Sequence, residues 1–166
     1  NIFNNREKLA DDYSHDPIYK NFLQITNQVN GLKDSLSDPS PAASLNFAYM
    51  IPKILDPGST SMYGEQEAIR RSQSLPEQVK GELNGAFGGG KLTDETKKYL
   101  YNLAVSQYKN QQLQFEDHRS GFRSKAIEDG LSPDWVARSP AYPDYRSLQL
   151  QADTPHSQTQ GIAPRP

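Results

Sequence analysis

Several features that usually point to a function are absent from this sequence. It contains no cysteine, so it can form neither a disulfide nor a thiolate zinc site, and its redox compartment is left open. The net charge is −2, from 18 basic and 20 acidic residues. The sequence therefore lacks the basic excess typical of nucleic-acid-binding proteins. No apolar run approaches the ~20 residues that span a bilayer, and no signal-peptide pattern is present.

Hydrophobic residues are also scarce, at 34% of 166 residues. This is low for a compact globule, so we expect an elongated molecule that buries part of its apolar surface against other subunits. The chain begins with Asn1 rather than Met, and we expect it to be a processed product or part of a longer chain.

The dominant feature is a proline-free stretch over residues 92–130. Thr93 is a good helix N-cap, Asp94 and Glu95 suit the positive end of a helix dipole, and Gly130 suits the position after the helix. Such a helix would be roughly 50 Å long at 1.5 Å per residue. We therefore predict an all-α fold: an elongated helical bundle with one long helix and an extended Pro-rich C-terminal tail.

We divide the chain into an N-terminal polar segment (1–15), a helical domain (16–138) and the extended Pro-rich tail (139–166). The tail combines prolines with Ser, Gln, Asp and Thr, a composition typical of polyproline-like, disordered segments. Tyr142, Tyr145, Leu148 and Leu150 are spaced along it like anchors. We predict that the tail is ordered only if something else holds it.

The most regular pattern follows Pro17. Apolar residues alternate at spacings of four and three, as in a coiled-coil seam, at Ile18, Phe22, Ile25, Val29, Leu32 and Leu36. The pattern predicts a helix with one apolar stripe. That stripe either faces the core of the same domain or forms a seam with another subunit, and the sequence favours neither.

The next stretch, residues 42–55, is the most apolar of the chain. We predict a helix here with a kink or break at Pro52, because proline removes a helix hydrogen bond. A turn follows at Asp56, Pro57 and Gly58.

Within this region, one motif resembles a known family. Phe47, Tyr49 and Met50 precede the run Lys-Ile-Leu-Asp-Pro-Gly-Ser at residues 53–59, and Gly64-Glu65 follows. The pattern is similar to a segment of tailed-bacteriophage internal virion or DNA-ejection proteins, some of which carry a lytic transglycosylase domain elsewhere. The resemblance covers roughly residues 40–138. It departs at Ile51-Pro52, which is inserted, and at Met62-Tyr63, where an Arg-Glu pair is usual.

The resemblance implies a virion structural protein that assembles in the phage head near the portal and helps deliver DNA through the host envelope. Its partners would be other virion proteins and further copies of itself. Packaged DNA would lie nearby without specific binding, and the host envelope would be contacted during ejection. Two alternatives stay open: a tail, portal-adaptor or scaffolding-like virion component, and a non-catalytic part of a phage lytic transglycosylase.

Four patterns could indicate chemistry, and each has a simpler interpretation. Asp11, Asp12, His15 and Asp16 could bind a metal, but Asp16 before Pro17 is a helix start. The glycines at 88–90 precede Lys91 without the order of a phosphate-binding loop, so we predict a corner between helices.

The other two patterns involve single residue types. His118 lies in a charged run with no identifiable catalytic partners. Seven glutamates could supply a transglycosylase acid, yet none sits in an apolar pocket evident from sequence. We therefore predict no catalytic residue, no metal and no cofactor, and that the chain is not an enzyme. Our predicted partner-binding residues are the apolar positions Ile18, Phe22, Ile25, Val29, Phe47, Tyr49, Met50, Ile54, Leu55, Trp135, Tyr142, Tyr145 and Leu148.

Overall fold

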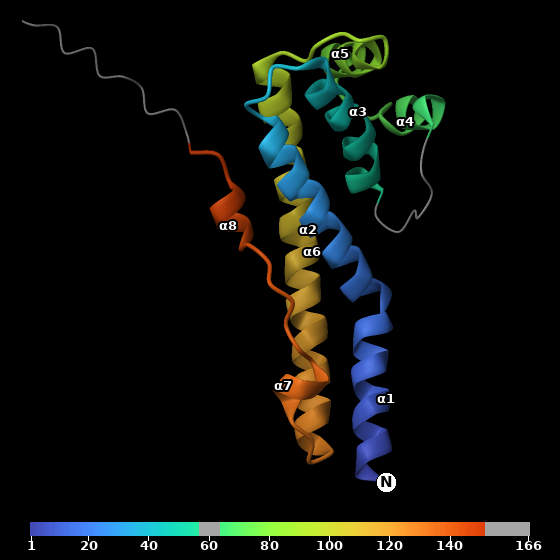
Figure 1. Cartoon of the computed structure of the whole chain (residues 1–166), viewed down its shortest axis with the longest axis vertical. Coiled ribbons are helices and arrows are strands. Elements are labelled where there is room, and N and C mark those ends of the chain that lie inside the picture. Colours follow the sequence, from blue (N-terminus) through green and yellow to red (C-terminus); the bar gives the residue numbers. More distant parts are fainter. Residues whose placement is uncertain (57–63, 152–166) are drawn as a thin grey trace, which may run out of the picture.

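The computed structural model describes residues 1–56 and 64–151. Over these residues the chain is all-α, without strands, and forms an elongated rod built around one long helix, as predicted (Figure 1). The helices are α1 (Ile2–His15), α2 (Pro17–Ser35), α3 (Pro41–Leu55), α4 (Glu65–Arg71), α5 (Glu77–Phe87), α6 (Asp94–Glu128), α7 (Pro133–Val136) and α8 (Tyr145–Leu148).

Helix α6 has 35 residues and runs the length of the rod. Its N-terminus is capped by Thr93, whose hydroxyl accepts a hydrogen bond from the Thr96 N–H at 3.2 Å. At the other end Gly130 adopts φ = +69°, a left-handed conformation that favours glycine, and the Leu131 N–H donates to the Ala126 carbonyl at 2.7 Å. Both ends lie where the sequence predicts them.

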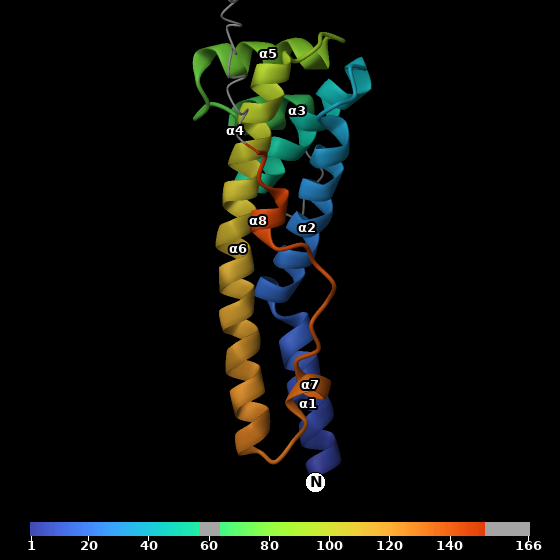
Figure 2. The ribbon, with the colours of Figure 1, turned by 90° about the vertical axis from the view of Figure 1, so that its left-hand side faces the viewer.

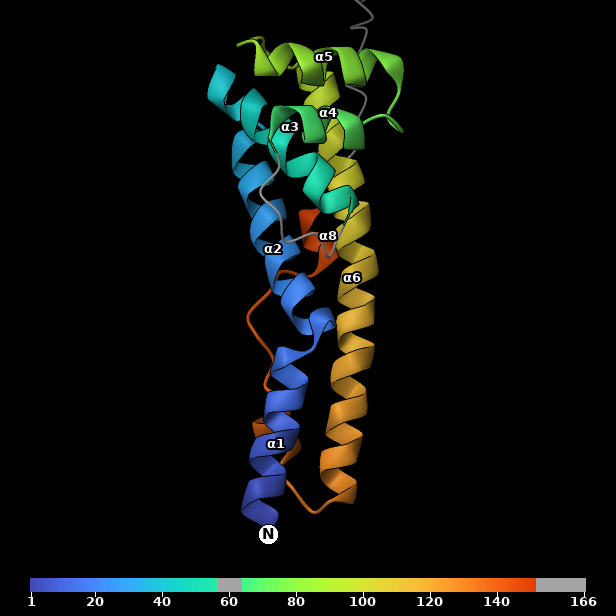
Figure 3. The same cartoon turned by 90° about the vertical axis from the view of Figure 1, so that its right-hand side faces the viewer.

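Helices α1 and α2 follow one another along α6, so that together they match its length (Figures 1 and 3). Asp16 separates them: its backbone is extended, with ψ = 139°, and its carboxylate accepts a hydrogen bond from the Ile18 N–H at 2.8 Å. Asp16 thus caps α2, and Pro17 is the first residue of that helix, as the sequence predicts.

The apolar stripe of α2 faces the chain's own core. Phe22 is fully buried, and its ring stacks on Phe115 of α6 with centroids 4.5 Å apart and planes at 12°. Ile25, Val29 and Leu32 are buried in the same cluster, which also includes residues of α3 and α5. Of the two alternatives for this stripe, the structure has the core-facing one.

Helices α3, α4 and α5 gather at one end of the rod (Figure 3). Helix α3 continues through Pro52 to Leu55, so a break at this proline does not occur. Ile51 and Ile54 on either side of it are buried, and this packing outweighs the missing helix hydrogen bond. The predicted turn after Asp56 lies outside the described residues.

Buried apolar side chains form two clusters of very different size. The large cluster extends from Tyr13 through α2, α3 and α5 to the N-terminal two-thirds of α6. At the opposite end of the rod, where α1 and α7 meet the end of α6, the cluster consists only of Leu9, Ala126, Leu131 and Val136, with Phe122 partly buried against both.

The described part of the tail is not free. Beyond α7 the chain turns back along the rod and lies beside α6 and α2, where α8 forms (Figure 2). The prediction that this segment needs something else to order it is therefore wrong over residues 139–151, because the chain's own helices hold it. Residues 152–166 lie outside the described part.

Candidate functional site

The most elaborate polar arrangement attaches residues 138–151, which we call the strap, to the helices. Three tyrosine hydroxyls donate to strap carbonyls: Tyr13 to Arg138 at 3.0 Å, Tyr108 to Pro143 at 2.5 Å and Tyr101 to Leu148 at 2.7 Å. All three acceptors are main-chain atoms. The tyrosines therefore set the path of the strap backbone.

Gln112 of α6 is the centre of this attachment. Its side chain is 1% exposed, and its amide oxygen accepts a hydrogen bond from the Tyr145 N–H at 2.8 Å. Its amide nitrogen donates to the Asp144 and Glu116 carboxylates, both at 3.0 Å. The Tyr142 hydroxyl adds a further bond to Glu116 at 3.1 Å. A buried amide with every partner supplied is stabilising, whereas an unsatisfied one would be costly.

Apolar contacts accompany these hydrogen bonds. The Tyr142 ring meets Phe22 edge-on at 4.9 Å and Phe115 at 5.6 Å between centroids. Tyr145 and Leu148 are 9% and 3% exposed. The strap therefore packs aromatic and aliphatic side chains against α2 and α6, in addition to its hydrogen bonds.

The pKa shifts of the tyrosines and of Asp144 favour the protonation states that these hydrogen bonds require. Burial raises the pKa of Tyr108 to about 12 and also raises the pKa of Tyr101, which keeps both hydroxyls protonated as donors. The Arg146 N–H and the Gln112 amide lower the pKa of Asp144, which keeps this acceptor ionised. The hydrogen-bonding roles are therefore constant across the neutral range.

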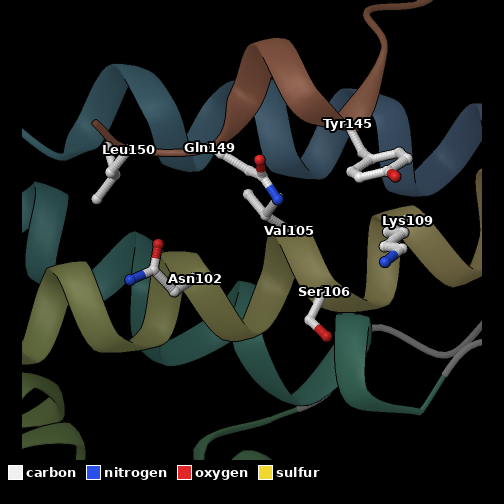
Figure 4. A pocket seen from close by; sticks show the side chains of 7 residues that line it. All are labelled: Asn102, Val105, Ser106, Lys109, Tyr145, Gln149 and Leu150. Carbon is white, nitrogen blue, oxygen red and sulfur yellow. The ribbon is translucent and has the colours of Figure 1, made fainter. Parts of the chain in front are cut away.

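A groove of about 400 Å³ lies between α6 and the strap (Figure 4). Lys109 provides its cation, with Nζ 5.1 Å from the centroid of the Tyr145 ring. The groove is lined by Asn102, Val105, Ser106, Lys109, Tyr145, Gln149 and Leu150. These residues supply one cation, amides and a hydroxyl, which allows polar contacts with a bound group.

A second hollow, of about 190 Å³, lies between α2 and α6, and all but one of its lining side chains are amides. It is lined by Ile18, Asn21, Gln107, Asn110, Gln111 and Gln114. Neutral amides can donate and accept hydrogen bonds at once, so this surface suits contact with another polar protein surface.

At the α1–α7 end, Arg6 lies between two aromatic rings. Its guanidinium carbon is 4.1 Å from the centroid of Trp135 and 4.8 Å from that of Phe3. Arg123 of α6 pairs with Asp134 of α7. These contacts connect three helices where few apolar side chains are buried.

Most of the predicted partner-binding residues contact the chain itself. Seven are buried: Phe22, Ile25, Val29, Phe47, Ile54, Tyr145 and Leu148. Four are partly buried and packed within the chain: Tyr49, Met50, Leu55 and Tyr142. Two are exposed: Ile18 and Trp135. A partner can therefore touch Ile18 and Trp135 directly, whereas the buried set would first have to be uncovered.

The candidate chemical groups do not converge. His15 Nδ1 lies 2.9 Å from the Asp11 carbonyl, and no group of three potential metal ligands occurs within residues 1–56 and 64–151. His118 stacks on Tyr13 with ring centroids 5.5 Å apart. The glycines at 88–90 form the predicted corner, in which the Gly90 N–H donates to the Gly85 carbonyl at 2.9 Å.

Among the glutamates, Glu82 has the clearest environment. Burial acts to raise its pKa, but hydrogen bonds from Thr96 and Thr93 outweigh burial and the pKa is lowered. A general acid needs the opposite shift. Glu82 instead helps to cap α6, since it accepts the Thr93 N–H at 2.8 Å.

The residues that the sequence analysis overlooked are Tyr101 and Gln112. A signal for Tyr101 was available: Tyr101, Tyr108, Phe115 and Phe122 follow one another at intervals of seven residues. Such a column of aromatic residues lies near one side of a helix and predicts a long aromatic contact. Gln112 has no comparable signal, because it stands among other glutamines that face solvent.

In comparisons with known proteins, no family model, curated protein or solved structure matches the chain. None of the helices over residues 1–56 and 64–151 has the length and apolarity to cross a membrane.

Proposed function

We propose that this chain is a structural component of a tailed-phage virion, an internal or ejection protein. It would assemble with other virion proteins in the head near the portal and help deliver DNA through the host envelope. The observation that carries the proposal is the motif beginning at Phe47 and continuing from Lys53. Its described residues lie in α3, at Asp56 and at the start of α4.

The positions of the motif residues are compatible with a structural role. Phe47 and Ile54 are buried in the large cluster, and Tyr49 meets Phe87 of α5 edge-on at 5.0 Å. Asp56 pairs with Arg71 of α4. The motif thus connects α3 to α4 and α5 at one end of the rod, as expected of residues with an architectural role.

The shape of the molecule adds support. A rod with a 35-residue helix offers long side faces, and proteins of this shape serve bundles and oligomers more often than compact binding sites. The amide surface around Asn110 and Gln114 can hydrogen-bond to a neighbouring rod without requiring opposite charges.

The decisive test is the position of the chain in its native particle. Quantitative mass spectrometry of purified virions, before and after DNA release is triggered in vitro, should find the chain in full particles and lose most of it from emptied ones. The major capsid protein is the matched control, because it stays in both.

Two results would contradict the proposal. Retention of the chain in emptied particles would indicate the tail, portal-adaptor or scaffolding-like alternative. Clearing of purified peptidoglycan by the isolated chain, lost on replacing one glutamate with glutamine, would indicate an enzyme.

A further inference from the structure

We propose that the face of α2 and α6 beneath the strap is a peptide-recognition site that also accepts the strap of a second copy, residues 142–148. Exchange of straps would then join two chains through the same contacts that each makes alone. This inference stands independently of the phage proposal.

The receiving surface on the helices and the strap that binds to it are separate parts of the chain. Outside the strap itself, the hydrogen-bonding groups on its backbone between positions 143 and 148 come from α6: Tyr108 and Tyr101 donate to its carbonyls, and Gln112 accepts its N–H. Helix α2 adds the ring of Phe22, which meets Tyr142 edge-on. This surface does not need to be covalently connected to the strap to present these groups.

The strap depends on this surface for its conformation. Its only helix, α8, has four residues, far fewer than a helix needs for stability in water. Asp144 caps α8 by accepting the Arg146 N–H at 2.9 Å. The bonds described above that hold residues 142–148 go to α6, and Tyr13 of α1 holds Arg138. The strap therefore behaves as a short recognition segment whose side chains Tyr142, Tyr145 and Leu148 enter the receiving surface.

A hinge is present at the start of the strap. The chain is fixed up to the first strap residue, because Arg119 Nε donates to the Ala137 carbonyl at 2.9 Å and the Tyr13 hydroxyl donates to the Arg138 carbonyl. Residues 139–141 are non-helical, and Ser139 and Ala141 are exposed. Pro140 keeps its neighbours extended, so rotation at this point redirects the whole segment without disturbing α7.

A second copy is the occupant best matched to the site. The receiving surface already fits this sequence, so exchange between copies needs no new complementarity, which is the usual basis of domain swapping. Attachment within one chain is favoured by its high effective concentration, and exchange is favoured as copies are crowded together. The structure therefore predicts strap exchange that increases with protein concentration.

The absence of cysteine makes a direct test available. Ser106 on α6 and Gln149 on the strap line the same groove and are exposed. Full-length chains carrying either Ser106→Cys or Gln149→Cys would be mixed, incubated at increasing concentration and treated with a short bismaleimide. A covalent pair of one chain of each kind is expected, and its yield should increase with concentration.

Three controls define the result. The double variant, with both cysteines in one chain, should cross-link internally and so report normal strap attachment. Replacing Ser106→Cys by Ser124→Cys, an exposed residue about 27 Å further along α6 at 1.5 Å per residue, should give little mixed product. Excess synthetic peptide 139–151 should suppress the mixed product, and its Leu148→Ala form should be at least about tenfold less effective, since losing a buried leucine side chain costs more than the free energy of a tenfold change.

The remaining outcomes overturn the proposal. These are the absence of mixed product at every concentration, equal yield with Ser124→Cys, or no suppression of the mixed product by excess peptide 139–151. Equal suppression by that peptide and by its Leu148→Ala form also contradicts strap exchange.

Discussion

The two ends of the rod are held together by different kinds of interaction. At the α3–α5 end, α2, α3, α5 and α6 share one large cluster of buried aromatic and aliphatic side chains. At the α1–α7 end, four small or medium apolar residues are supplemented by Arg6 between two rings and by the Arg123–Asp134 pair. Because apolar burial contributes in proportion to area, while exposed ion pairs contribute little, the α1–α7 end should open first.

The largest effect should come from the large cluster. Phe22→Ala removes a fully buried ring that stacks on Phe115, and we expect a loss of about 3–5 kcal/mol in the free energy of unfolding, measured in urea. Leu9→Ala at the other end should cost less, about 2 kcal/mol, because a small cluster near the surface can collapse around the cavity. Equal losses would contradict the difference between the two ends.

An intermediate effect is expected at the strap. Gln112→Ala leaves the Tyr145 N–H without its acceptor and should cost about 1–3 kcal/mol. Hydrogen exchange should accelerate at residues 143–148 and remain unchanged in α1 and α7. Gln114→Ala on the exposed side of the same helix is the matched control and should leave both regions unaffected.

A smaller effect is expected at the α1–α7 end. Arg6→Met removes the cation between Phe3 and Trp135 and should cost about 0.5–1 kcal/mol. Because Trp135 is the only tryptophan, its fluorescence reports this site alone, and its emission should shift. Lys8→Met on exposed α1 controls for the lost charge; a shift of the same size there would refute the stacking contribution.

The smallest effect depends on pH. A hydrogen bond from Arg123 and its charge lower the pKa of Asp134 below the usual value. The contribution of this pair is therefore complete above the unfolded pKa of about 3.9 and is lost as pH falls through the lower, folded value. Trp135 emission should change in this acid range. In Asp134→Asn that acid step should be absent, and its persistence would assign the change to another group.

Local sequence signals predicted the helices well. The Thr93 cap and Gly130 mark the ends of α6, and Asp16-Pro17 marks the start of α2. The position of Pro52 was less informative, because burial of Ile51 and Ile54 continues α3 beyond it. Propensity acts on neighbouring residues, whereas packing sums over the whole cluster and can override it.

The position of the strap could not be predicted from local sequence signals. Its prolines and polar residues predict an extended segment, and its aromatic anchors predict a binding surface. That the surface belongs to the same chain depends on Gln112, Tyr108 and Tyr101, which lie 32, 35 and 47 residues from their strap partners in sequence. The buried partner-binding candidates likewise pack against residues that are distant in sequence. Local patterns therefore could not distinguish them from the exposed candidates.

The sequence by itself therefore determined the all-α class, the length of α6 and the stripe on α2, since caps and periodicity are encoded within a few residues. Only the tertiary structure decided that α2 faces its own core, that the strap lies on α6, and that the two ends bury apolar clusters of different size. Those outcomes depend on which distant apolar faces and hydrogen-bonding groups meet, and each is stabilised only when both partners are in place.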